Sequence, residues 1–104
     1  MHKLAATKAA LIRGLVQHKK ARDAARLFIV EGPKPIQELV ASHAAFFQAL
    51  VVTEEGLATA GPSWVNTLER SGCPVYVCQD RVLATLSDLT TPSGMLGVVR
   101  QSSL

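Results

Sequence analysis

Short apolar runs, rich in strand-forming residues, alternate along the chain with longer stretches in which apolar residues recur every three or four positions. This alternation favours a sheet that is at least partly parallel and has helices on both faces, because a helix is the usual connection between parallel strands. We predict a three-layer α/β/α sandwich with a mixed, mostly parallel central sheet of about four strands. The expected strands are residues 27–30, 46–52, 75–78 and 95–100.

The stretches between these runs carry helix signals. Apolar residues at helical spacing predict a first helix over residues 4–18, in which Gly14 is a weak point. Pro35 suits the first turn of the helix after the first strand, whereas residues 53–56 are polar and predict a turn. Residues 19–26 are expected to form a short helical or irregular stretch. Further helices are predicted from Gly61-Pro62-Ser63 to Ser71-Gly72 and from Asp80 as an N-cap.

The length of the chain suits one domain. Of its 104 residues, we expect 1–100 to form that domain and 101–104 to begin a linker. A hydrophobic content of 48% argues against disorder. No apolar run is long enough to cross a bilayer, and the N-terminus lacks the continuous apolar core of a secretory signal. The expected location is therefore the cytoplasm.

Positive charge is concentrated in the first third of the chain. Residues 1–34 contain eight Lys and Arg against two Asp and Glu, a net charge of +6. Residues 35–104 contain three against six, a net charge of −3. This asymmetry is typical of an edge that binds a polyanion, although a solvated helical face would give the same pattern.

The sequence contains no recognisable active site. A nucleophile elbow, a phosphate-binding Walker loop and a dinucleotide-binding glycine motif are all absent from it. His2, His18 and His43 lack metal-ligand spacing, and His2 is expected in a disordered terminus. Cys73 and Cys78 should face opposite ways along extended chain, so neither a disulfide nor a zinc site is expected. We predict no catalytic, cofactor-binding or metal-binding residue.

The most specific signal is a basic cluster that leads into an apolar strand. Lys19-Lys20-x-Arg22 precedes Leu27-Phe28-Ile29-Val30, a run that predicts a buried strand, and the strand ends at Glu31-Gly32. Gly32 can adopt a positive φ or allow another chain to approach closely. Glu31 is expected to anchor Arg22 or a neighbouring amide, and direct contact with RNA is the alternative.

This pattern, basic residues before a Phe-containing strand that ends Val-Glu-Gly, resembles the N-terminal substrate-binding domain of SpoU/TrmH-type RNA methyltransferases. A second motif lies near the other end of the chain. Leu86-Ser87-Asp88, then Thr91-Pro92-Ser93-Gly94 and an apolar strand, is similar to the family's Leu-Ser, Thr-Pro-Gln-Gly and Val-rich strand. Ser93 departs from the pattern, because the family more often has Gln there. The resemblance covers about residues 8–100.

The resemblance implies a fold like that of the kink-turn-binding ribosomal proteins. Kink-turn recognition itself is not supported, because Glu31-Gly32-Pro33-Lys34 stands where those proteins carry an Asn-Glu motif. The family's knotted catalytic domain, which binds S-adenosylmethionine and methylates a ribose 2′-hydroxyl, would follow Leu104. Its motifs are absent from this sequence, so the chain alone is expected to be no enzyme and to bind no cofactor. The parent enzyme would use S-adenosylmethionine, and a homodimer through its catalytic domain is one arrangement that the resemblance allows.

The expected partner is structured RNA, with ribosomal RNA foremost, and neither a membrane nor a metal is expected. Two rival interpretations remain open: a ribosomal-type RNA-binding protein that is complete at this length, and a protein-interaction or dimerisation module that uses the weakly charged residues 35–104. The predicted RNA contacts are Lys19, Lys20, Arg22, Arg26, Glu31, Gly32 and Lys34, with Thr91, Pro92, Ser93 and Gly94 as a second edge.

Overall fold

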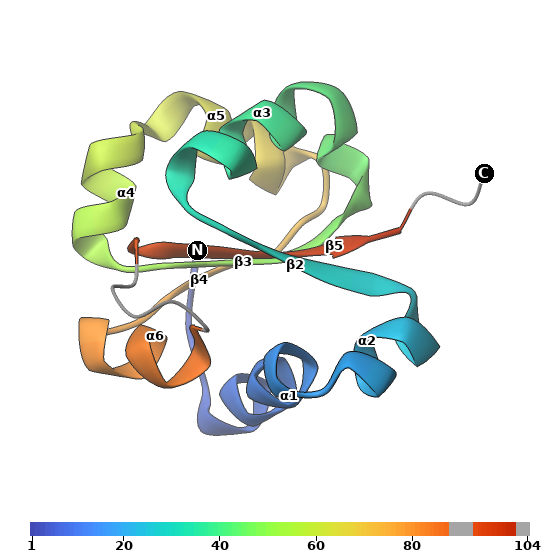
Figure 1. Ribbon diagram of the computed structural model, residues 1–104. Coiled ribbons are helices and arrows are strands. Elements are labelled where there is room, and N and C mark those ends of the chain that lie inside the picture. Colours follow the sequence, from blue (N-terminus) through green and yellow to red (C-terminus); the bar gives the residue numbers. More distant parts are fainter. Residues whose placement is uncertain (88–92, 102–104) are drawn as a thin grey trace.

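The computed structural model describes residues 1–87 and 93–101 and shows a single sheet between two layers of helices. Helices α3, α4 and α5 cover one face of the sheet, and α1, α2 and α6 cover the other (Figure 1). The predicted three-layer α/β/α sandwich is therefore confirmed. The helices are α1 (Ala6–Gln17), α2 (Lys19–Ala25), α3 (Pro33–His43), the short 3-10 helix η1 (Ala44–Phe46), α4 (Glu54–Ala60), α5 (Pro62–Arg70) and α6 (Asp80–Leu86).

The sheet has five strands in the order β1-β4-β3-β5-β2. β4 pairs in parallel with β1 and β3, whereas β5 is antiparallel to both of its neighbours, β3 and β2. Four strands thus run in one direction, which confirms a mixed and mostly parallel sheet. The strands are β1 (His2–Lys3), β2 (Leu27–Glu31), β3 (Phe47–Val52), β4 (Val75–Val77) and β5 (Met95–Arg100).

Strand β1 was not predicted. His2 pairs with Tyr76 in register, and their rings lie 5.9 Å apart, so the expectation of a disordered terminus for His2 is wrong. Two residues are too few to show the alternation by which a strand is recognised. Residues 2–3 form strand β1 because they pair with β4, and no property of these two residues alone predicts a strand.

Each face of the sheet supports its own apolar core. Side chains alternate along a strand, so Leu50 and Val52 face α3 and α5, whereas Val51 faces α1 and α6. Ile36, Val65 and Leu68 are fully buried in the first core. Ile12, Leu83, Leu86 and Leu96 belong to the second. The central strands β3 and β5 contribute side chains to both cores and lie between them.

Helix α4 replaces the predicted turn at residues 53–56. Thr53 is its N-cap, and the hydroxyl oxygen of Thr53 accepts a hydrogen bond from the backbone N–H of Gly56 at 3.0 Å. Glu54 and Glu55 occupy the first turn, where carboxylates interact favourably with the helix dipole. Two acids and a glycine resemble a solvated turn in sequence, and here they begin a helix.

The N-cap of α6 likewise differs from the prediction: it is Gln79, with Asp80 as the first helical residue.

Strand β2 is an edge strand and is less buried than predicted. Leu27 is buried, but Phe28, Ile29 and Val30 are only half-buried. The sheet order gives β2 one neighbour, β5, so each face of β2 is partly open. A run of apolar residues does not distinguish a central strand from an edge strand that is covered on both faces by helices.

We expect Phe28→Ala to lower the free energy of unfolding by about 2 kcal/mol, roughly half of what truncation of a fully buried Phe costs. Phe28 packs against the core under α3 but keeps part of its ring in solvent. Leu50→Ala is the matched comparison, because Leu50 is fully buried in the same core and should cost about 2–5 kcal/mol. Urea denaturation measures both. A Phe28→Ala midpoint equal to that of the wild type would contradict the packing described for β2.

Candidate nucleic-acid interface

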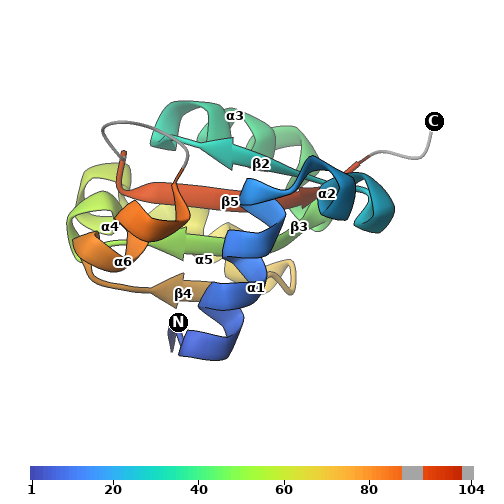
Figure 2. The same cartoon turned by 60° about the horizontal axis from the view of Figure 1, so that its bottom comes forward.

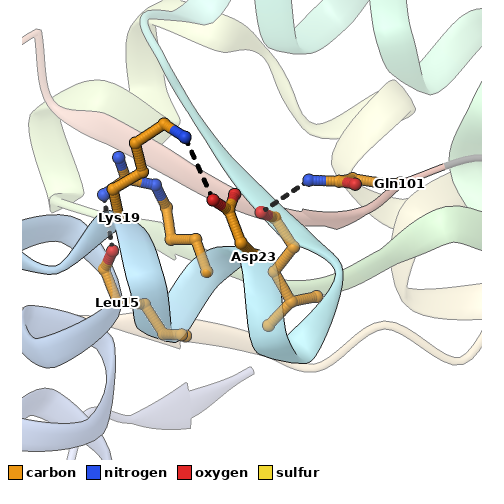
Figure 3. Close-up of polar contacts among 6 residues, drawn as sticks. Leu15, Lys19, Asp23 and Gln101 are labelled. Carbon is orange, nitrogen blue, oxygen red and sulfur yellow. Dashed lines mark hydrogen bonds and ion pairs between the residues drawn. The ribbon is translucent and has the colours of Figure 1, made fainter.

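The predicted basic cluster lies on α2 and at its C-terminal end. Lys20 and Arg26 are exposed, and Arg26 ends the helix in the left-handed conformation with φ 57°. Lys19 is also exposed, and its Nζ lies 3.0 Å from Oδ2 of Asp23 one turn along the helix (Figure 3). An exposed pair of this kind contributes little to stability, so Lys19 remains available to a phosphate.

Arg22 has a structural role, with backbone partners that the sequence did not predict in place of the suggested Glu31. Its side chain is half-buried, and Nη1 donates hydrogen bonds to the backbone oxygens of Leu15 at 2.8 Å and Val16 at 2.7 Å. These carbonyls belong to the last turn of α1, where the helix itself supplies no donors. A guanidinium there also interacts favourably with the helix dipole. Arg22 therefore joins α2 to the end of α1.

The other predicted contacts lie at the far end of β2. Glu31 accepts a hydrogen bond from the hydroxyl of Ser87. Gly32 has a φ of 103°, as its predicted role requires, and its N–H donates to the oxygen of Met95 at 3.1 Å. Lys34 is exposed on the first turn of α3. A Cβ on Gly32 would lie 3.8 Å from the hydroxyl oxygen of Ser93, so the Glu31–Gly32 turn and the start of β5 are neighbours.

The predicted contacts therefore form two groups, one at each end of strand β2. α2 precedes β2 and lies beyond its start, whereas α3 begins at the end of β2 and turns back over one face of the sheet (Figure 1). Five residues of extended chain separate the groups by about 15 Å. Gly94 lies beside the second group, whereas the predicted contacts Thr91 and Pro92 lie outside the described residues.

The carboxyl edge of the parallel strands holds a cavity of about 480 Å³ beside the second group. Ligands of open α/β sheets commonly bind at this edge. Its lining includes the carboxylates of Glu55 and Asp80 and one cation, the guanidinium of Arg81, so acidic groups outnumber basic ones there. A neighbouring cavity of about 940 Å³ adds Glu54. Carboxylates repel phosphate, so this edge suits RNA less well than the α2 edge does.

Neither cysteine is a reactive thiolate. Burial, and secondarily the carboxylate of Glu69, raises the pKa of Cys73 to about 12. Burial also raises the pKa of Cys78. Both thiols are free, and they pack on opposite faces of the sheet, as predicted. Within the described residues, no group of three or more His, Cys, Asp or Glu side chains is placed to hold a metal.

The family described as the MRM3-like substrate binding domain matches residues 11–97. The chain belongs to this family. Solved structures agree in fold. An AdoMet-bound rRNA methyltransferase of Sinorhizobium meliloti has a TM-score of 0.70 and 21% identity over 98% of this chain and 36% of that one. The crystal structure of an RNA 2′-O ribose methyltransferase has a TM-score of 0.65 and 21% identity, over 98% of this chain and 38% of that one. The SpoU methyltransferase AviRb of Streptomyces viridochromogenes, in complex with AdoMet, has a TM-score of 0.65 and 18% identity over 95% and 37%.

This MRM3-like domain thus spans little more than a third of the solved chains that it matches. No curated protein sequence matches it. The family match confirms the resemblance to the substrate-binding domains of SpoU/TrmH-type RNA methyltransferases. In the described part of the chain, no helix is both long and apolar enough to pass through a membrane.

Proposed function

We propose that this MRM3-like domain binds structured RNA, foremost ribosomal RNA, for an S-adenosylmethionine-dependent RNA ribose 2′-O-methyltransferase. The observation that carries the proposal is the family match together with the exposed cations at the α2 edge. Support comes from the solved structures, which are described as methyltransferases of RNA or rRNA and cover this domain with about a third of their length. Methyl transfer itself is assigned to the remainder of such a protein.

Lys19, Lys20 and Arg26 act in this proposal by neutralising phosphates. Each such contact releases condensed counterions, so the affinity falls as the salt concentration rises. Arg22 serves binding indirectly, because its bonds to the end of α1 fix the orientation of α2. Lys34 and the turn at Gly32 form a second contact at the other end of β2. An RNA that lies along the outer edge of β2 reaches both groups, which favours recognition of RNA shape over base-by-base reading.

Fluorescence anisotropy with a labelled rRNA hairpin tests the proposal directly. The wild-type domain should bind the hairpin at low salt, and the logarithm of the association constant should fall with the logarithm of the salt concentration by about 0.7–0.9 for each phosphate contact. Absence of binding at low salt would contradict the proposal. It would favour the rival interpretation of a protein-interaction module.

The domain alone is expected to bind no S-adenosylmethionine. The resemblance places the cofactor in the knotted domain. The family that this chain matches is described as a substrate binding domain, so its carboxyl-edge cavities are not expected to hold the cofactor. Isothermal titration calorimetry with S-adenosylmethionine should give only heats of dilution, while RNA titrated into the same sample gives binding heat. Saturable cofactor binding at micromolar concentration would contradict this expectation.

A further inference from the structure

An apolar groove of about 500 Å³ lies beside α1, at the amino edge of the parallel strands and away from the carboxyl-edge cavities. Leu11 and Leu15 from α1 and Ala21 from α2 form part of its wall. Leu11 is 61% exposed, and apart from Met1 it is the one large hydrophobic side chain of the described residues that is exposed. Figure 2 shows α1 crossing this face of the sheet with α2 at its end. Volumes of this size suit small organic ligands.

A β-bulge places a polar residue, Gln48, in the lining of this groove. The register between β3 and β5 shifts between Phe47 and Ala49, so Gln48 has no partner in the ladder. Phe47 packs in the core under α3, whereas Ala49 packs in the core under α1. The extra residue therefore leaves both Gln48 and Ala49 in the lining of the groove, and Gln48 is exposed. Bulges often redirect a side chain beside a functional site.

The charge around the groove suits a nucleic acid. Its lining contains Lys8 and His18 and no carboxylate, in contrast with the carboxyl-edge cavities. His18 directly precedes Lys19 and Lys20 of the basic cluster. The guanidinium of Arg22 donates a hydrogen bond to the backbone oxygen of Leu15, a wall residue, so this bond links the groove to the helix that carries the basic cluster.

We propose that this groove takes one unpaired nucleobase extruded from the bound RNA. The inference rests on the proposed RNA-binding function and deepens it. A base has apolar faces and a polar edge, which match the aliphatic walls and the amide of Gln48. Lys8, near the start of α1, and the lysines of α2, beyond the end of α1, contact the phosphates on either side of that base. An acidic protein segment would also find apolar walls here, but an amide side chain in the lining can hydrogen-bond the edge of a base.

A pair of RNA hairpins tests the groove. The two have the same stem and loop, and one carries a single bulged nucleotide. The wild-type domain should bind the bulged hairpin about 5-fold more tightly, the lower end of what stacking of one base on an aromatic side chain gives, because the walls of this groove are mainly aliphatic. Anisotropy at one fixed salt concentration measures both affinities, so the phosphate contribution is common to the two hairpins.

Gly14→Leu is the decisive variant. Gly14 lines the groove, and apart from the neighbouring backbone of its own helix no atom lies within 4 Å of the position that a Cβ would take, so a leucine there occupies space in the groove without a clash against the core. Leucine also favours the helix more than glycine does. Ala41→Leu on α3 is the matched control, because it adds an exposed leucine to the opposite face of the sheet. Gln48→Leu removes the amide at nearly constant volume.

Gly14→Leu should abolish the preference for the bulged hairpin and leave the affinity for the unbulged one unchanged, while Ala41→Leu should keep the preference. Gln48→Leu should make the preference insensitive to which base is bulged.

Equal binding of both hairpins by the wild type would overturn the inference and leave the proposed function standing. A preference that survives in Gly14→Leu would also overturn it. Self-association of the wild type that Gly14→Leu abolishes, without any bulge preference, would assign the groove to a second copy instead. Failure to bind either hairpin would refute the proposed function as well.

Discussion

Replacing Lys19, Lys20 and Arg26 together with alanine is expected to weaken binding of structured RNA by about two to three orders of magnitude at 0.1 M salt, since each phosphate contact accounts for roughly tenfold there. The salt dependence should flatten by about 2–3 units of log–log slope, and different RNA sequences should weaken alike. All three side chains are exposed, and the one ion pair among them, between Lys19 and Asp23, contributes little to stability. Circular dichroism should therefore show a folded variant.

The matched control removes the same charge elsewhere. Lys3, Arg70 and Arg81 are also exposed, and they lie outside the α2 cluster. Their triple alanine variant has the same net charge and should keep most of the affinity. Arg22 is left unchanged in both variants, because losing its bonds to α1 would confuse folding with binding. Equal weakening by both triples would show that the RNA responds to net charge and that α2 is no specific contact surface.

The sequence predicted regular elements well where its pattern was long. The helix expected over residues 4–18 is α1 (Ala6–Gln17), and the strand expected over 95–100 is β5 (Met95–Arg100). Residues whose state depends on a distant partner could not be predicted in this way. β1 exists because β4 offers it a free edge, and β2 is half-exposed because the sheet ends there.

The same division applies to the candidate site. Sequence reveals charge, so the exposed lysines of α2 were predicted as contacts. It does not reveal the angle between two helices, and that angle directs Arg22 at the backbone of Leu15 and Val16. The groove at Gln48 was missed because a single-residue bulge leaves no signal in an apolar run. Gly14 did carry a signal, since a glycine within a helix weakens it, and the structure places Gly14 in the lining of the groove.

Two glycine-to-alanine substitutions in helices should change stability in opposite directions. Gly56 lies in α4, and a Cβ there would be 2.2 Å from the backbone oxygen of Gly94 and 2.9 Å from its carbonyl carbon. Backbone atoms cannot move aside as a flexible side chain can. The same oxygen accepts a hydrogen bond from the N–H of Thr53 at 3.0 Å, so displacement would also weaken the start of α4. We expect Gly56→Ala to cost about 2–3 kcal/mol or more, despite the higher helix propensity of alanine.

Gly14→Ala is the counterpart, because the space around Gly14 is open. The substitution keeps the helical backbone and reduces the conformational entropy of the unfolded chain, so it should stabilise the domain by about 0.5–1 kcal/mol. Urea denaturation of the two variants should place their midpoints on opposite sides of the wild-type value. The dependence of the unfolding free energy on urea concentration should be unchanged. A Gly56→Ala variant as stable as the wild type would contradict the contact between α4 and Gly94. Because Gly94 leads into β5 and Ser93 lies beside the Gly32 turn, the same contact adjoins the second group of predicted RNA contacts.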